Sequence, residues 1–143
     1  MKTIGLCSDH AGFKIKEFAK QVLIEKGLPY KDFGTYSEES CDYPDFAHPL
    51  AYAIENGEVY PGIAVCGSGA GISMALNKHQ GIRAALCWSA DVAKLAREHN
   101  DANVLVLPGR FISEEEARKA IDVFLSTAFE GGRHQKRVDK IPL

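Results

Sequence analysis

Residues 62–78 read GIAVCGSGAGISMALNK, an apolar run joined to a helix-like pattern through a turn with three glycines in five positions. A continuous apolar run such as 62–66 is typical of a strand that is buried on both faces of a sheet. A strand, a glycine turn and a helix in succession bring free N–H groups together at the start of the helix. The stretch therefore predicts an α/β fold with a site for an anion or an oxyanion at the end of this strand.

Cys66 stands where the expected strand meets the turn. The start of a helix favours negative charge, so we expect the pKa of this thiol to lie below the ordinary value of about 8.5. On this interpretation Cys66 is a base or a nucleophile. The alternative is a small apolar residue that ends a strand before an ordinary glycine turn, and these residues alone leave both interpretations open.

Apolar runs alternate with helical periodicity along the rest of the chain, and no linker interrupts them. We expect strands at residues 3–7, 29–33, 62–66, 83–87 and 103–107. The expected helices are one with an apolar stripe at 15–23, one at 44–56 that contains Pro49, one from 71, one at 90–98, and one that begins at the capping-box pattern of residues 113–116. The alternation predicts a single α/β domain over residues 1–143, a three-layer sandwich with a five-stranded parallel sheet.

The preferred strand order is 2-1-3-4-5, which reverses direction between the first and third strands. Ligands of open α/β sheets bind above the carboxyl ends of the strands at such a reversal. The loops at residues 8–12 and 66–71 meet there, and they carry a carboxylate, an imidazole, a thiol and a hydroxyl group. We therefore expect a small-molecule site in this crevice.

Composition narrows the functional classes. The 143 residues include 17 basic and 19 acidic side chains, a net charge of -2 that gives no reason to expect nucleic acid or an anionic membrane as a partner. The N-terminus becomes polar at Ser8, and no apolar run approaches the roughly 18 residues of a membrane span. Four cysteines without C-x-x-C or paired Cys/His spacing argue against structural zinc. We expect a cytoplasmic protein with reduced thiols and no metal or other cofactor.

The sequence does not match three other known glycine-loop motifs, and in each case one required residue is missing. A dinucleotide fingerprint needs G-x-G-x-x-G, but the residue that would be the last glycine is Ile72. No G-K-[ST] follows, so the lysine of a nucleotide triphosphatase loop is missing. A cysteine phosphatase would need an arginine six residues after its nucleophile, and that residue is again Ile72.

Six ordered blocks of the chain resemble type B ribose-5-phosphate isomerases. They are SDHAGFKIK at 8–16, DYPDFA at 42–47, VCGSGAGIS at 65–73, GIRAAL at 81–86, HNDANVLVLPGR at 99–110 and GGRHQKRVDKI at 131–141. The resemblance implies a Rossmann-like fold, a dimer or tetramer, no metal, and interconversion of ribose 5-phosphate and ribulose 5-phosphate.

The resemblance also implies residue roles. Cys66 would move the C2 proton to C1, Ser68 would relay a proton between O1 and O2, His99 would open the sugar ring and Asp9 would hold sugar hydroxyls. Backbone N–H groups of residues 67–71 suit the enediolate oxygen, at about 3 kcal/mol per well-placed donor. The substrate-binding set is His10, Gly67, Gly69, Ala70, Gly71, Asn100, Arg110, Arg133 and Arg137.

Each role has a simpler alternative. Asp9 after a strand suits a helix cap, His99 at a helix end suits the helix dipole, and the segment 130–143 suits a solvated basic tail. The glycines before Arg133, and the placement of Arg137 four residues later, favour phosphate binding by this tail, or a subunit contact.

The topology makes a prediction about assembly. His99 follows the fourth expected helix and precedes the fifth strand, so it lies at the amino edge of the sheet, opposite Cys66. If both act on one sugar, a neighbouring chain must supply His99, which requires a homodimer or homotetramer with shared sites. Two alternative functions remain: an isomerase of a six-carbon sugar phosphate (allose or galactose 6-phosphate) and a non-catalytic phosphosugar-binding protein.

Overall fold

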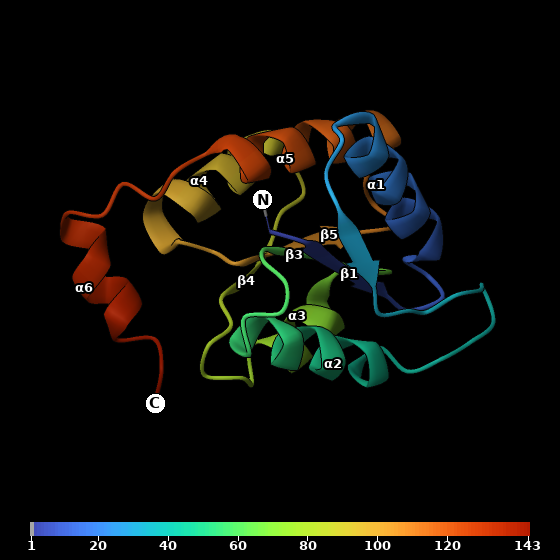
Figure 1. Cartoon of the computed structure of the whole chain (residues 1–143), viewed down its shortest axis with the longest axis horizontal. Helices are drawn as coiled ribbons and strands as arrows, with labels where there is room; N and C mark the ends of the chain where they lie inside the picture. The colour runs from blue at the N-terminus through green and yellow to red at the C-terminus, as the bar shows by residue number, and fades with distance from the viewer. Residues whose placement is uncertain (1) are drawn as a thin grey trace.

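The computed structural model describes residues 2–143, which alternate between strands and helices around one parallel sheet (Figure 1). The ends of every expected strand are found within one residue of the prediction. The elements are, in chain order, β1 (Ile4–Ser8), α1 (Phe13–Glu25), β2 (Tyr30–Asp32), α2 (Pro44–Glu55), β3 (Gly62–Cys66), α3 (Ala70–Leu76), β4 (Ala84–Leu86), α4 (Ala90–Asn100), β5 (Val104–Pro108), α5 (Glu114–Ser126) and α6 (Arg133–Asp139).

The helices form two layers around the sheet. One layer contains α1, α4 and α5, and the other contains α2 and α3 (Figure 1). A cluster of buried side chains lies between each layer and the sheet. The apolar stripe predicted for α1 is buried except for the half-buried Phe18. The stripe of α5 is buried at Ala117, Ala120, Ile121 and Phe124, and Ser113 caps this helix by accepting the N–H of Glu116 at 3.1 Å. The predicted three-layer α/β sandwich is confirmed.

The predicted strand order 2-1-3-4-5 is wrong at its last two positions. The observed order is β2-β1-β3-β5-β4, so β5 pairs with β3 and β4 forms the edge. A central strand is covered on both faces, which suits the fully buried VLVLP run of β5 better than the three partly exposed residues of β4. The connection from β3 through α3 therefore skips the position next to β3 and reaches the edge at β4. The next connection, through α4 on the opposite face of the sheet, returns to the skipped position with β5.

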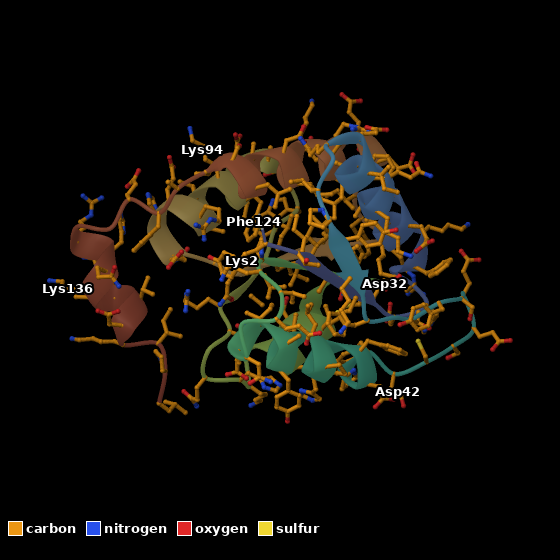
Figure 2. All side chains as sticks on the ribbon, viewed as in Figure 1. Lys2, Asp32, Asp42, Lys94, Phe124 and Lys136 are labelled. Carbon is orange, nitrogen blue, oxygen red and sulfur yellow. The ribbon has the colours of Figure 1, made fainter. Side chains whose placement is uncertain are left out.

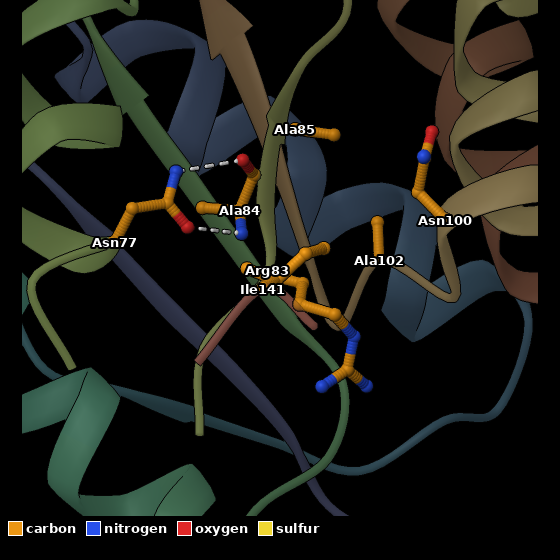
Figure 3. A pocket seen from close by; sticks show the side chains of 7 residues that line it. All are labelled: Asn77, Arg83, Ala84, Ala85, Asn100, Ala102 and Ile141. Atoms are coloured by element: carbon orange, nitrogen blue, oxygen red, sulfur yellow. Dashed lines mark hydrogen bonds between the residues drawn. The ribbon is translucent and has the colours of Figure 1, made fainter. Parts of the chain in front are cut away.

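The edge position of β4 is protected by a side chain. The Asn77 amide donates to the carbonyl oxygen of Ala84 at 3.0 Å and accepts the N–H of Ala84 at 2.8 Å (Figure 3). An unpaired edge exposes such backbone groups to other chains. Asn77 thus occupies, over one residue, the place that a further strand would take.

The C-terminal segment contains the short helix α6, which lies beside α4 at one end of the molecule (Figure 1). His134 and Val138 are its buried residues, whereas Arg133 and Arg137 are exposed. Within residues 2–143, no helix combines the length and the apolar character that crossing a membrane requires.

A buried cation fastens the edge strand β2 to α1. Lys16 is 0% exposed, and its ammonium group lies 2.6 Å from the Asp32 carboxylate, which Lys20 contacts at the same distance. Asp32, labelled in Figure 2, lies at the end of β2 and also accepts the N–H of Gly34. Burial alone would raise the pKa of Asp32, but the hydrogen bonds from Lys16 and Lys20 outweigh it and hold this pKa below its usual range.

We predict that Asp32→Asn lowers the free energy of unfolding by about 3 kcal/mol at neutral pH, because the buried Lys16 would keep only the more distant and more exposed carboxylate of Glu17, at 3.4 Å. A carboxyl group with a lowered pKa stabilises the fold above its unfolded pKa of about 4, and this stabilisation is lost as the pH falls further. The free energy of unfolding should therefore fall less in the variant than in the wild type as the pH decreases below about 4. Urea unfolding at a series of pH values measures this difference.

The matched control is Glu58→Gln, which removes the carboxylate of the half-exposed pair with Lys31 on the same strand. Exposed pairs contribute less than about 1 kcal/mol, so this variant should unfold almost as the wild type does. Equal losses in the two variants would contradict the special role of the buried pair.

Candidate active site

Three loops meet at the carboxyl edge of the sheet and surround a cavity of about 320 Å³. They follow β1, β3 and β5, the three central strands. Seven of the predicted site residues line this cavity together: Asp9, His10, Cys66, Gly67, Ser68, Gly71 and Arg110. The crevice expected between the first and third strands is therefore present, and the change in strand order adds the β5 loop to it.

Close backbone contacts hold the three loops in place. A Cβ atom on Gly12 would lie 2.6 Å from the carbonyl carbon of Val65, and one on Gly109 would lie 3.1 Å from the carbonyl oxygen of Ala11. The Gly109 N–H donates to the oxygen of Cys66 at 2.8 Å, and the Arg110 N–H donates to the oxygen of Gly67 at 2.9 Å. Glycine allows this approach because any side chain would separate the loops.

Cys66 ends β3, is 4% exposed and borders the cavity. The turn that follows reaches α3 through Gly69, whose φ of 79° is a left-handed conformation. In the described part of the chain, the N–H groups of Gly67, Ser68 and Gly69 have no hydrogen-bond acceptor. A thiol and several available N–H donors therefore lie on one short turn, which suits a reaction that passes through an oxyanion.

Ser68 and His10 have defined hydrogen-bonding roles. The Ser68 hydroxyl oxygen accepts the N–H of Ala70 at 3.2 Å, so its own proton remains available for donation. In His10, Nδ1 accepts the N–H of Cys41 at 3.2 Å, which places the proton of a neutral imidazole on Nε2. His10 thus offers an N–H donor from the wall of the cavity that Arg110 also lines.

Asp9 is not the N-cap of α1, which is Gly12, but its carboxylate orders the turn that leads into this helix. Its Oδ1 accepts the N–H of Gly12, the residue before the first turn of α1, at 2.9 Å. The residue also lines the cavity, and a carboxylate accepts more than one hydrogen bond. The bond to Gly12 and ligand binding are therefore compatible at this position.

Tyr43 and Phe111 line the cavity and were not predicted as site residues. The ring of Tyr43 lies so close to Gly71 that a Cβ atom there would be 2.6 Å from Cζ. Tyr43 belongs to the DYPDFA block, so that block contained the signal, but only the fold brings the N-terminus of α2 to the glycine turn. Phe111 is 75% exposed and follows Arg110, where nothing in the sequence distinguishes it from a surface residue.

The remaining predicted residues lie elsewhere. Gly69 and Ala70 shape the turn without lining the cavity.

His99 and Asn100 end α4 at the amino edge of the sheet, as the topology predicted. Asn100 borders a separate pocket with Arg83 and Ala102 (Figure 3). Arg133 and Arg137 are on α6, beyond α4. One chain therefore assembles the half of the predicted site that contains Cys66 and leaves His99 outside it.

Comparison with known proteins assigns this arrangement to a family. A family model described as Ribose/Galactose Isomerase matches residues 4–141. The chain belongs to the ribose/galactose isomerase family. It is 45% identical over 141 residues to ribose-5-phosphate isomerase B of Escherichia coli. The aligned region covers 99% of this chain and 95% of the Escherichia coli protein.

Solved structures agree with this assignment. The ribose 5-phosphate isomerase of Thermotoga maritima superimposes with a TM-score of 0.97 at 52% identity, covering 99% of this chain and 97% of that one. Ribose-5-phosphate isomerase B of Mycoplasma genitalium, solved with bound ribulose-5-phosphate, gives a TM-score of 0.91 at 44% identity, covering 97% and 93%. The resemblance seen in the sequence blocks and the expectation of an isomerase are both confirmed.

The four cysteines of this isomerase occupy different environments. Cys7 and Cys87 are completely buried, and burial raises the pKa of both thiols, that of Cys87 to about 12. Cys41 is partly exposed beside His10, and Cys66 borders the cavity. The thiolate is the form that reacts with alkylating agents, so environment should decide which cysteines react.

We predict that iodoacetamide modifies Cys41 and Cys66 of the native protein near neutral pH and leaves Cys7 and Cys87 unmodified. Mass spectrometry of the digested protein gives the extent of modification at each position. Saturating inorganic phosphate should slow the modification of Cys66. Modification of Cys7 at the rate of Cys66 would contradict the proposed difference, since the two residues lie on neighbouring strands and differ mainly in access to the cavity.

Proposed function

We propose that this protein interconverts ribose 5-phosphate and ribulose 5-phosphate through an enediolate, with Cys66 as the base. The observation that carries the proposal is that Cys66, Gly67 and Ser68 line one cavity, and that the N–H groups of Gly67, Ser68 and the adjacent Gly69 have no hydrogen-bond acceptor among the described residues. The family assignment and the ribulose-5-phosphate bound to the Mycoplasma genitalium relative support the substrate class.

The reaction moves one carbon-bound proton. In the open-chain aldose, the Cys66 thiolate takes the C2 proton, and the electron pair of that bond forms the C1=C2 double bond while O1 becomes negative. The amides of residues 67–69 stabilise this oxyanion. The thiol then returns the proton to C1, and the Ser68 hydroxyl carries the O2 proton to O1, which leaves a ketone at C2.

The two ends of the sugar require different partners. The imidazole Nε2–H of His10 and the guanidinium of Arg110 suit the phosphate dianion, because charge-assisted donors bind it strongly. Asp9 suits the sugar hydroxyls as an acceptor. Tyr43 closes the wall beside Gly71 and excludes water from the enediolate.

Ring opening needs a further acid and base, which we assign to His99 of a neighbouring subunit. His99 lies at the opposite edge of the sheet from Cys66, so one chain does not bring them to one sugar. On this proposal a homodimer, or a tetramer built from such dimers, pairs the cavity of one subunit with His99, Asn100, Arg133 and Arg137 of its partner.

We predict that Cys66→Ala lowers kcat for ribose 5-phosphate by about 10²–10⁴-fold, the usual contribution of a general base. Binding of ribose 5-phosphate, measured by calorimetry, should persist because the phosphate contacts remain. Cys87→Ala, which removes a buried thiol outside the cavity, is the matched control and should keep its kcat. Full turnover by Cys66→Ala would remove the thiol from the mechanism. Faster wild-type turnover of allose 6-phosphate would reassign the substrate to the six-carbon alternative.

Subunit sharing can be tested by mixing two inactive variants. A heterodimer of Cys66→Ala and His99→Asn chains contains one site with both substitutions and one intact site, if the two residues come from different subunits. After unfolding and refolding an equal mixture, we expect about a quarter of the wild-type activity, because about half of the dimers are mixed. Mixtures as inactive as the separate variants would place both residues in one chain's site.

A further inference from the structure

A cluster of metal-binding side chains lies where the C-terminal segment folds back on α4. The N–H of Glu130 donates to the carbonyl oxygen of Glu98 at 3.0 Å, which fixes the segment to the last turn of that helix. His99, Glu130 and His134 project into the junction from α4, from the connecting segment and from α6. The cysteine and histidine spacing in the sequence gave no indication of this cluster, because its members come together only through the fold.

The distances within the cluster are close to those of a metal site. Oε1 of Glu130 lies 3.5 Å from Nε2 of His134 and 4.0 Å from Nε2 of His99, and one ligand atom from each residue lies within 4.8 Å of the others. Zinc bonds of 2.0–2.1 Å in tetrahedral geometry place ligand atoms about 3.3 Å apart. A contraction of up to about 1.5 Å would therefore bring the three groups into coordination.

The imidazole rings need one adjustment. They are stacked with their centroids 4.3 Å apart and an interplanar angle of 15°, so their nitrogen lone pairs lie in two nearly parallel planes. One ring must turn for both lone pairs to reach a single ion. The side chain of His99 is 39% exposed and can turn, whereas that of His134 is 10% exposed and is held in place.

We propose that His99, Glu130 and His134 form a binding site for Zn²⁺ or a similar borderline divalent cation, with water as the fourth ligand. Two neutral imidazoles and one carboxylate are a donor set that such ions prefer. The site itself does not depend on the function proposed above. Its consequence rests on that function: a bound ion occupies the His99 lone pair, so it would inhibit the opening of the sugar ring.

A second histidine cluster provides a matched control. His48 Nδ1 and His79 Nε2 are joined by a 2.7 Å hydrogen bond, and Nδ1 of His79 lies 3.2 Å from the Glu55 carboxylate. Glu55 also accepts the N–H of Gly81. The ring nitrogens of His48 and His79 bond to each other and His79 also bonds to Glu55, so they do not converge on a common point. This cluster therefore has the same residue types as the proposed site but is not expected to bind a metal ion.

The test is a titration of the whole protein, freed of metal with a chelator, with Co²⁺ followed by visible absorption and with Zn²⁺ followed by calorimetry. We expect one ion per chain, a d–d spectrum of tetrahedral Co²⁺, and affinity at least about tenfold weaker in His134→Gln and Glu130→Gln. His79→Gln should bind as the wild type does. Unchanged affinity in His134→Gln, or a sulfur-to-cobalt charge-transfer band, would overturn the site.

Activity in the same samples separates the two proposals. Zn²⁺ should inhibit turnover of ribose 5-phosphate by the wild type, and a chelator should restore it. Absence of binding overturns the metal site and leaves the proposed function untouched. Binding at the cluster without inhibition supports the metal site and counts against a role for His99 in ring opening.

Discussion

The close approach of three backbone loops at the carboxyl edge of the sheet is the constraint on which the site depends. Gly12 packs against the carbonyl group of Val65, and Gly109 packs between Ala11 and Cys66. Two hydrogen bonds then tie the β5 loop to the Cys66 turn. These contacts use backbone groups and the side chain of Val65, so the side chains of Cys66, Ser68 and Arg110 remain available to the cavity.

The same arrangement distinguishes one thiol from the others. Cys7 and Cys66 lie on adjacent strands and both belong to the core cluster under α2 and α3, but Cys7 is completely enclosed there, and burial keeps its thiol protonated. Cys66 is the last residue of its strand and meets the cavity and the amides of the turn. A difference of position at a strand end thus separates a structural cysteine from a candidate catalytic one.

The two edges of the sheet carry different parts of the chemistry. The carboxyl edge holds the thiol, the amides and two groups suited to phosphate, whereas the amino edge holds His99 and the segment that leads to α6. A sheet of parallel strands keeps these edges apart by the length of its strands. Association between subunits is therefore the proposed means of completing the site. The His99–Glu130–His134 cluster contains His99, the residue that a partner subunit would contribute to the cavity.

The sequence by itself was enough to predict the five strands, the first five helices and the cavity residues around Cys66, because apolar periodicity and glycine turns are local signals; α6 was expected only as a tail. It also placed His99 at the opposite edge, since chain direction in a parallel sheet follows from the order of elements. The exchange of β4 and β5 was not predictable in this way, because both connections have similar lengths and the choice depends on which strand is better covered on both faces. Tyr43 against Gly71, and Glu130 between two histidines, likewise arise from contacts between distant segments, which exist only once the helices pack.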